Sequence, residues 1–168
     1  TTVALYIHQT GDYNILLEEN TYFRDVQFSR AKGKDYSWSF SYGSKLKDNK
    51  GNVYRGSILE HMLVQHLVQF FNVGEHNIIR LESADWNDGL DMAFPRGESV
   101  AFMSFYGGNL LALADLLESL AKKKGIDEIL LAKEMVCLLD SLRNGNLNYN
   151  NIEEKKYLLW EVYFKSVQ

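Results

Sequence analysis

Cysteine and proline are nearly absent from this chain of 168 residues, which contains one of each. A single Cys137 cannot form a disulfide within the chain. Because it lies in an apolar helical pattern, we predict a core residue in a reducing compartment rather than a nucleophile. The scarcity of cysteine therefore favours a cytoplasmic protein.

Positive charge and long apolar runs are also scarce. The formal net charge is -4 and the pI is near 5.6, so the chain offers no general attraction for nucleic acid. The one basic run, Lys122 to Lys124, is expected to end a helix, where cations complement the helix dipole. Charged residues interrupt the apolar stretches before they reach the roughly 20 residues of a membrane span, so we expect no membrane partner.

Both ends of the chain suggest a piece of one larger domain. The sequence starts at Thr1 without a signal-peptide pattern, and an apolar face over residues 152–167 requires neighbours to cover it. We expect residues 1–168 to be a fragment of one catalytic domain. The remaining segments of the same enzyme, or a second copy in a homodimer, would then be its partners.

Helix signals dominate the chain. Apolar spacing and caps predict a helix over residues 1–9 that ends at Gly11, a short element over 13–19, and helices over 57–71, 98–124, 126–143 and 152–167. Ser57 and Glu60 form a Ser-x-x-Glu capping box in which each side chain is expected to bind a free amide. The predicted fold class is all-α.

Residues 31–56 have a different pattern. Aromatic residues from Tyr36 to Tyr42 alternate with small polar residues, and a cluster rich in Lys, Asp, Asn and Gly follows. We predict a long aromatic-rich loop or a short hairpin insertion here. Its aromatic side chains are expected to serve in packing rather than in ligand stacking.

The chemistry is expected in a loop over residues 81–97, which holds or adjoins five carboxylates: Glu82, Asp85, Asp88, Asp91 and Glu98. Crowded carboxylates repel one another, and partial burial would raise the pKa of one of them enough for it to act as a general acid. An indole can pack on a sugar ring while an amide binds its hydroxyls, which makes Trp86 and Asn87 candidate sugar ligands.

Several other interpretations of this loop stay open. A calcium loop beginning at Asp85 would need Gly where Leu90 stands and Glu where Arg96 stands, so the spacing disfavours it. Asn-Asp-Gly is also a good structural turn on its own. Arg96 is expected to pair with an acid or a ligand anion, and Glu98 suits a first helical turn. The histidines lack a metal-binding spacing, so we predict no metal site.

The sequence resembles a known family in four places. ADWNDG is followed by GESV and preceded by YIHQTGD and EHMLVQHL. This order is similar to that of the inverting carbohydrate phosphorylases of the cellobiose, cellodextrin, chitobiose and 1,2-β-oligoglucan type, and the similarity extends from Tyr6 to about Leu120. The resemblance implies part of an (α/α)6 barrel with the catalytic loop at about 81–97.

The resemblance also implies roles for individual residues. Asp88 would protonate the glycosidic oxygen while inorganic phosphate, the co-substrate, attacks the anomeric carbon, and no cofactor is expected. Trp86 would contact the sugar, and Asp85, Asn87, Arg96 and Glu98 are the further candidates for binding the oligosaccharide. DGLDMAFPRG replaces a shorter glycine-rich linker before GESV, which leaves the acceptor sugar open.

Two other function classes remain possible from the sequence. A barrel hydrolase or glucanotransferase would share the acid, but an inverting hydrolase also needs a carboxylate base to activate water. The other class is a helical module that binds sugar, or only packs against other domains, without catalysis. We expect no phosphorolysis by this chain alone.

Overall fold

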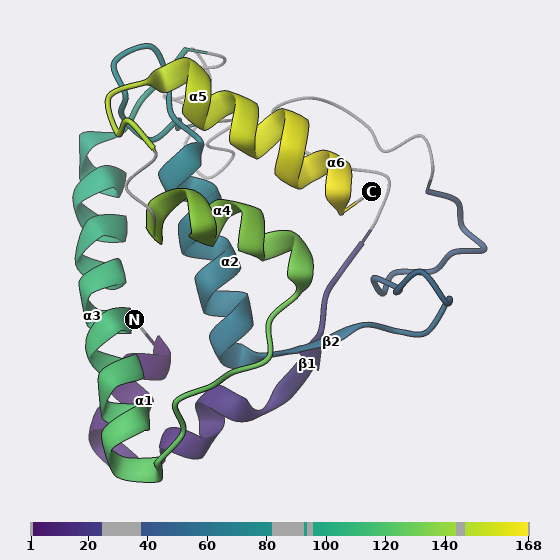
Figure 1. Ribbon diagram of the computed structural model, residues 1–168, viewed down its shortest axis with the longest axis vertical. Helices are drawn as coiled ribbons and strands as arrows, with labels where there is room; N and C mark the ends of the chain where they lie inside the picture. Colours follow the sequence, from purple (N-terminus) through teal and green to yellow (C-terminus); the bar gives the residue numbers. More distant parts are fainter. Residues whose placement is uncertain (1, 25–37, 82–92, 94–95, 144–146, 168) are drawn as a thin grey trace.

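The computed structural model describes residues 2–24, 38–81, 93, 96–143 and 147–167 (Figure 1). The described residues are mainly helical, which confirms the all-α prediction and agrees with part of a helical barrel. In chain order the elements are α1 (Thr2–Thr10), the 3-10 helix η1 (Tyr13–Leu17), β1 (Glu19–Thr21), β2 (Arg55–Ser57), α2 (Ile58–Phe71), α3 (Val100–Lys124), α4 (Lys133–Arg143), α5 (Ile152–Tyr157), the π-helix η3 (Leu158–Tyr163) and α6 (Phe164–Ser166).

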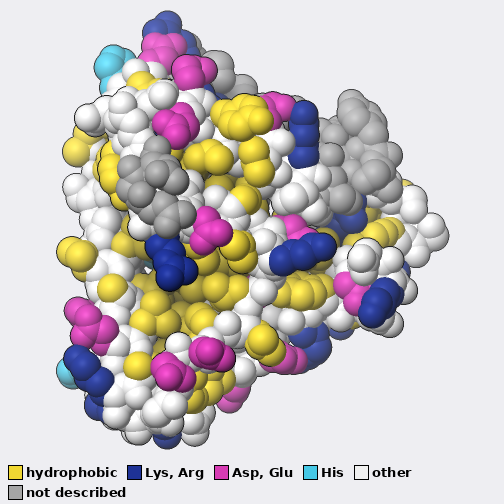
Figure 2. All heavy atoms as spheres, viewed as in Figure 1, with side chains coloured by type: hydrophobic (Ala, Val, Ile, Leu, Met, Phe, Trp, Pro, Cys, Tyr) yellow, Lys and Arg dark blue, Asp and Glu magenta, His cyan; other side chains and the backbone are white. Residues whose placement is uncertain are grey.

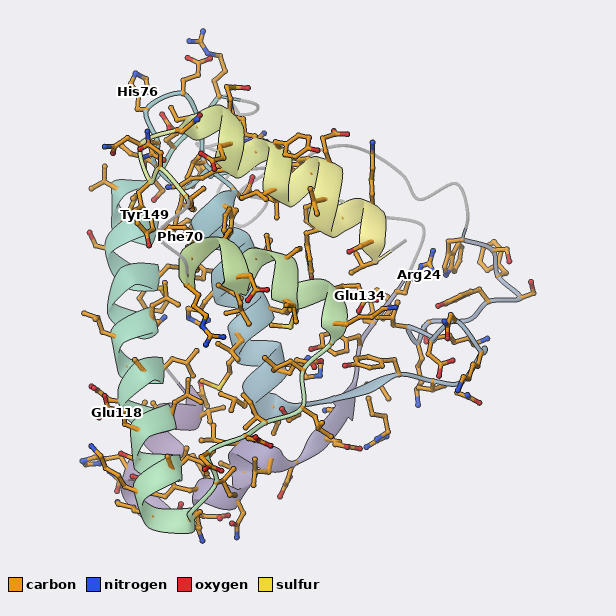
Figure 3. All side chains as sticks on the ribbon, in the orientation of Figure 1. Arg24, Phe70, His76, Glu118, Glu134 and Tyr149 are labelled. Atoms are coloured by element: carbon orange, nitrogen blue, oxygen red, sulfur yellow. The ribbon has the colours of Figure 1, made fainter. Side chains whose placement is uncertain are left out.

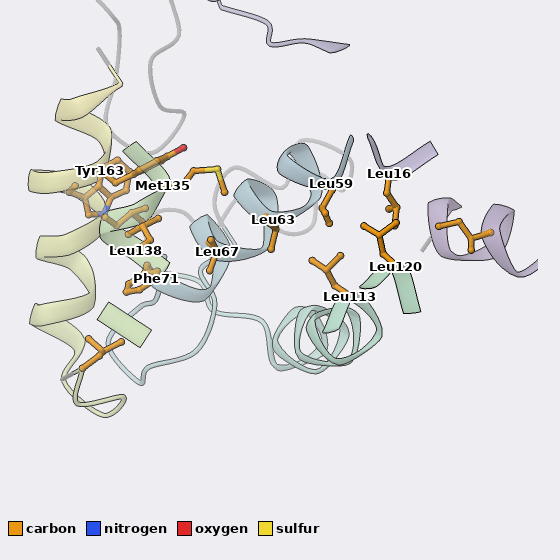
Figure 4. Close-up of a cluster of buried hydrophobic side chains, with 14 residues drawn as sticks. Leu16, Leu59, Leu63, Leu67, Phe71, Leu113, Leu120, Met135, Leu138 and Tyr163 are labelled. Atoms are coloured by element: carbon orange, nitrogen blue, oxygen red, sulfur yellow. The ribbon is translucent and has the colours of Figure 1, made fainter. Parts of the chain in front are cut away.

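Helix α2 lies at the centre of the hydrophobic core. Leu59, Leu63, Leu67 and Phe71 recur every fourth residue and are all buried, because this spacing places them on one face. They pack with buried side chains toward both ends of the helix, as Figure 4 shows: Leu16, Leu113, Leu120, Met135, Leu138 and Tyr163. The core therefore joins α2 to η1, α3, α4 and the C-terminal helix.

The predicted caps of α2 and α3 are confirmed in most respects. Ser57 Oγ accepts the amide of Glu60 at 3.1 Å, and Gly125 ends α3 in the left-handed conformation at φ 64°. Helix α3 begins at Val100, two residues later than predicted, because Ser99 is its cap. The reciprocal half of the capping box is wrong, since the Glu60 carboxyl group turns into the core instead of toward Ser57.

The fourth helix is shorter than predicted. Residues 126–132 form no helix, and α4 begins at Lys133. The amide of Ala132 donates to Glu60 Oε2 at 2.6 Å, which holds the chain before α4 against α2. A contact between residues far apart in the sequence thus outweighs the local preference for helix.

The C-terminal helix confirms the prediction for residues 152–167 to within one residue. Asn151 caps it by accepting the amide of Glu154, and α5, η3 and α6 run continuously from Ile152 to Ser166. Its middle is a π-helical turn, a feature that is rare in proteins and frequent at functional sites. Leu159, Trp160 and Tyr163 of this turn are buried.

Residues 38–54, here called the arm, project from the helical body in Figure 1. Strands β1 and β2 pair in antiparallel fashion at its base, and isolated bridges join Phe23 to Lys45 and Lys47 to Val53. The prediction of a loop or short hairpin is therefore confirmed for the described residues, where residues 47–53 form the hairpin. The expected packing of its aromatic side chains is wrong for Phe40, which is 93% exposed.

Helix α3 buries Leu113 and Leu120 but exposes many apolar residues. Figure 2 shows hydrophobic side chains at the surface of the molecule in the orientation of Figure 1. Among the described residues it is the one helix long and apolar enough to cross a membrane, judged by length and composition alone. Asp115 is the first charged residue of the helix, so the charges in this helix are too few to exclude it on composition. The same composition also suits a helix covered by protein neighbours.

Candidate active site

The loop predicted to carry the chemistry is placed only at its two ends. Asp85, Trp86, Asn87 and Asp88 lie outside the described residues, so their predicted roles are not tested by the structure. Leu81, Ala93 and residues 96–99 are described. The position from which the acidic loop leaves the fold, and to which it returns, is therefore known.

Backbone hydrogen bonds hold the two ends of the loop together. The amide of Leu81 donates to Gly97 O at 2.8 Å, and the amide of Ser99 donates to Ile79 O at 2.9 Å. Between them Arg80 and Glu98 form an antiparallel bridge. We call residues 79–81 and 97–99 the neck of the loop. This pairing brings the chain back to its starting point after the whole acidic segment.

A tight turn supports the neck from the other side. Residues 74–78 reverse the chain, with the amide of Gly74 donating to Ile78 O at 2.9 Å, and Val73 bridges to Ile79. Asn77 occupies the left-handed region at φ 61°, which Asn tolerates better than most residues. The amide of Arg80 donates to Asn72 O at 3.0 Å, so the first side of the neck is paired on both edges.

Glu98 joins the turn to the neck through its side chain. It accepts the amides of His76 at 3.0 Å and Ile78 at 3.2 Å, and the ring Nδ1 of His76 lies 2.6 Å from Oε2. The Glu98 side chain is only 11% exposed. A Cβ on Gly74 would lie 2.5 Å from the Glu98 side chain, which explains why glycine stands there.

The environment of Glu98 favours its ionised form. Desolvation by itself would raise the pKa of this carboxyl group, but the hydrogen bonds from His76 and from the two backbone amides outweigh it, so that the pKa lies below its usual value. Glu98 stands two residues before α3 rather than in its first turn. Its predicted contact with sugar stays a prediction, and the structure shows that both carboxylate oxygens already have partners.

Arg96 pairs with an acid that the sequence did not indicate. Its Nη2 lies 2.6 Å from Oε2 of Glu75, and both side chains are more than half exposed. The hydrogen bond from Arg96 lowers the pKa of Glu75. Arg96 was expected to meet an acid of the loop or a ligand anion. Its partner lies 21 positions earlier, in the turn that supports the neck, and no local pattern links the two.

Two further sequence predictions concern the thiol of Cys137 and a metal site. Cys137 is partly buried and its thiol donates to Glu134 O at 3.0 Å. Burial raises the pKa of this thiol, which disfavours the nucleophilic thiolate. Within the part of the chain that the structure describes, no group of three or more His, Cys, Asp or Glu side chains is arranged to hold a metal ion.

The sequence of this region matches a family of carbohydrate-active enzymes. The model of the glycosyl hydrolase 94 superfamily, catalytic domain, matches residues 37–151, which is well over half of the chain. The chain belongs to the glycosyl hydrolase 94 superfamily. The match contains the arm, α2, the acidic loop with its neck, α3 and α4, and it ends just before α5. The comparison with curated proteins found no match to this chain.

Proposed function

We propose that the protein supplies the general acid and part of the sugar site of an inverting glycoside phosphorylase that acts on β-linked gluco-oligosaccharides. Inorganic phosphate is the co-substrate, and the product is an α-sugar 1-phosphate. The observation that carries this proposal is the match to the glycosyl hydrolase 94 catalytic domain over a region that includes the ADWNDG loop.

In the proposed reaction Asp88 donates a proton to the glycosidic oxygen as the bond to the anomeric carbon breaks. A phosphate oxygen attacks that carbon from the opposite face, so the configuration inverts. Phosphate already carries the negative charge of a nucleophile, and no carboxylate base is required to activate it. Asp85 and Asp91 add negative charge near Asp88, which raises the pKa of an acid that must keep its proton near neutral pH.

The neck supports this proposal through geometry. A general acid contributes only when its proton lies within hydrogen-bond reach of the leaving oxygen, so the loop that carries it requires a fixed origin. The pairing of Leu81 with Gly97, and the contacts of Glu98 with the turn, supply such an origin. Arg96 and Glu98 are thereby proposed to act by shaping the loop as well as by binding substrate.

The test compares phosphate-dependent turnover of cellobiose by the polypeptide of the full reading frame containing these residues with that of its Asp88→Asn variant. We expect α-glucose 1-phosphate from the parent and a loss of about 10²- to 10⁴-fold in the variant, the usual contribution of a general acid. Glu118→Gln, an exposed acid on α3 far from His76 of the turn (Figure 3), is the matched control and should keep full activity.

Two outcomes would overturn the proposal. Glucose without sugar phosphate, formed equally well in the absence of phosphate, would identify a hydrolase, and full activity of Asp88→Asn would remove the assigned acid. The 168-residue chain, assayed in parallel, is expected to give no detectable sugar phosphate.

A further inference from the structure

A cleft of about 390 Å³ lies beside the neck, between residues of the family match and the C-terminal helix that follows it. One wall is formed by Val73 and Arg80. The other wall is one face of the C-terminal helix, which contributes side chains spaced three and four residues apart: Glu153, Lys156, Tyr157, Trp160 and Glu161. Its volume is within the range of roughly 300–1,000 Å³ that is usual for small-molecule sites.

The two walls are fixed relative to one another. Lys155, 2% exposed, points away from the cleft into the interior, where its Nζ donates to Asn77 Oδ1 at 2.9 Å and lies 4.5 Å from the centre of the Phe70 ring. Asn77 Nδ2 in turn donates to Tyr149 O at 2.9 Å. These contacts attach α5 to the turn that supports the neck, so the cleft is a preformed feature.

The charges that line the cleft cancel. Arg80 and Lys156 supply two positive charges, and Glu153 and Glu161 supply two negative charges. Lys156 lies 3.2 Å from Glu153, and Lys165 just outside the cleft lies 2.6 Å from Glu161. A ligand with a net charge gains little from such a lining, whereas a neutral ligand with many hydroxyl groups can use both the donors and the acceptors.

The aromatic residues of the cleft suit a flat apolar surface of the ligand. Tyr157 is 60% exposed and offers its ring at the cleft, while Trp160, 9% exposed, forms part of the floor. An aromatic ring beside carboxylates and a guanidinium group is the combination that binds the apolar face and the hydroxyls of a pyranose. Trp160 and Glu161 belong to the π-helical turn η3, a distortion that is frequent at functional sites.

We propose that the C-terminal helix and the neck form a saccharide-binding cleft that holds one or two neutral β-linked glucose units next to the base of the catalytic loop. The choice of a saccharide rests on the carbohydrate part of the proposed function and not on phosphorolysis. Arg80 connects the two regions directly, because it lines the cleft and bridges to Glu98 in the neck.

The experiment is a titration of the 168-residue chain with cellobiose in the absence of phosphate, followed by the backbone amide signals in nuclear magnetic resonance spectra. We expect shifts that cluster at residues 73, 80 and 153–161. Tyr157→Ala should weaken binding about tenfold, as expected for the loss of an aromatic contact, and Glu161→Gln should weaken it less. Inorganic phosphate alone should leave these signals unchanged.

Two matched variants control the titration. Tyr6→Ala removes another exposed tyrosine, and Glu118→Gln removes another exposed acid that pairs with a lysine four residues later, as Glu161 does. Both should bind cellobiose like the parent. Circular dichroism checks that each variant is folded. If Tyr157→Ala does not fold, the cellobiose affinity of Glu161→Gln tests the proposal instead.

The proposal is overturned if cellobiose leaves residues 153–161 unperturbed, or if Tyr157→Ala and Glu161→Gln both bind like the parent. The cleft proposal and the proposed function can fail independently, because different experiments test them. Asp88→Asn should leave the cleft signals and their cellobiose response intact, and a cleft that fails to bind cellobiose leaves the outcome of the phosphorolysis assay unaffected.

Discussion

Glu60 and Glu98 are both carboxyl groups that hold distant segments together, but they do so in different surroundings. Glu60 is 1% exposed and accepts the phenol groups of Tyr22 and Tyr54 at 2.8–3.1 Å, together with the amide of Ala132. Glu98 lies in the neck and binds the backbone amides of the adjacent turn and the exposed ring of His76.

The difference lies in what the partners would do without the carboxyl group. The phenols of Tyr22 and Tyr54 are partly buried beside Glu60. Burial raises the pKa of both tyrosines most, and the hydrogen bond to Glu60 raises it further. Gly56 is required in the same cluster because a Cβ there would overlap Glu60 Oε1. Water can replace the Glu98 carboxylate more easily, since His76 is 74% exposed. The Glu60 carboxyl group therefore joins the arm, α2 and the start of α4. Its loss should destabilise the fold more than the loss of the Glu98 carboxyl group from the neck.

The largest effect is expected for Glu60→Leu. This change leaves two phenol groups and one amide without their acceptor, and each buried donor left unpaired costs about 1–3 kcal/mol, so the free energy of unfolding should fall by about 3 kcal/mol or more. Urea denaturation at pH 7 measures it. Glu60→Gln keeps the shape and one acceptor oxygen and should lose less. Equal stability of Glu60→Leu and the parent would show that the cluster does not hold the segments together.

A smaller effect that depends on pH is expected for Glu98→Gln. Because the pKa of Glu98 is lowered in the folded protein, its contribution is present above the unfolded pKa of about 4.3 and is lost as the pH falls through the folded value. The variant should lose about 1.5–3 kcal/mol of unfolding free energy at pH 7, the usual contribution of a hydrogen bond to a charged group. The loss should shrink toward zero below about pH 4.

The measurement for Glu98→Gln is a set of urea denaturation curves between pH 7 and pH 3. Glu118→Gln, an exposed acid that pairs with Lys122, is the control and should change stability little at any pH. A deficit of Glu98→Gln that stays constant across the pH range would contradict an ionic role for this carboxylate.

The smallest effect is expected for the ion pair between Arg96 and Glu75. Both side chains are more than half exposed, so water and salt screen their attraction. A double-mutant cycle of Arg96→Gln and Glu75→Gln should give a weak coupling at low salt that disappears when salt is added. A coupling that persists at high salt would show that the pair is as important to the neck as Glu98.

The sequence predicted the features that depend on neighbouring residues. Ser57 begins α2 and Gly125 ends α3, because a cap uses atoms only a few residues away. The spacing of Leu59, Leu63 and Leu67 gave the buried face of α2 for the same reason. The ADWNDG motif likewise indicated a carbohydrate-active enzyme before any coordinates, and the match to the glycosyl hydrolase 94 catalytic domain confirms the superfamily.

The sequence alone determined the helical class and the caps at Ser57 and Gly125, since each follows from periodicity or from contiguous residues. Only the tertiary structure decided the direction of the Glu60 side chain, the late start of α4 and the pairing of Glu98 with His76. Their partners stand 72 positions apart for Glu60 with Ala132 and 22 apart for Glu98 with His76. Such contacts depend on how the helices pack, and no local pattern of residues encodes them.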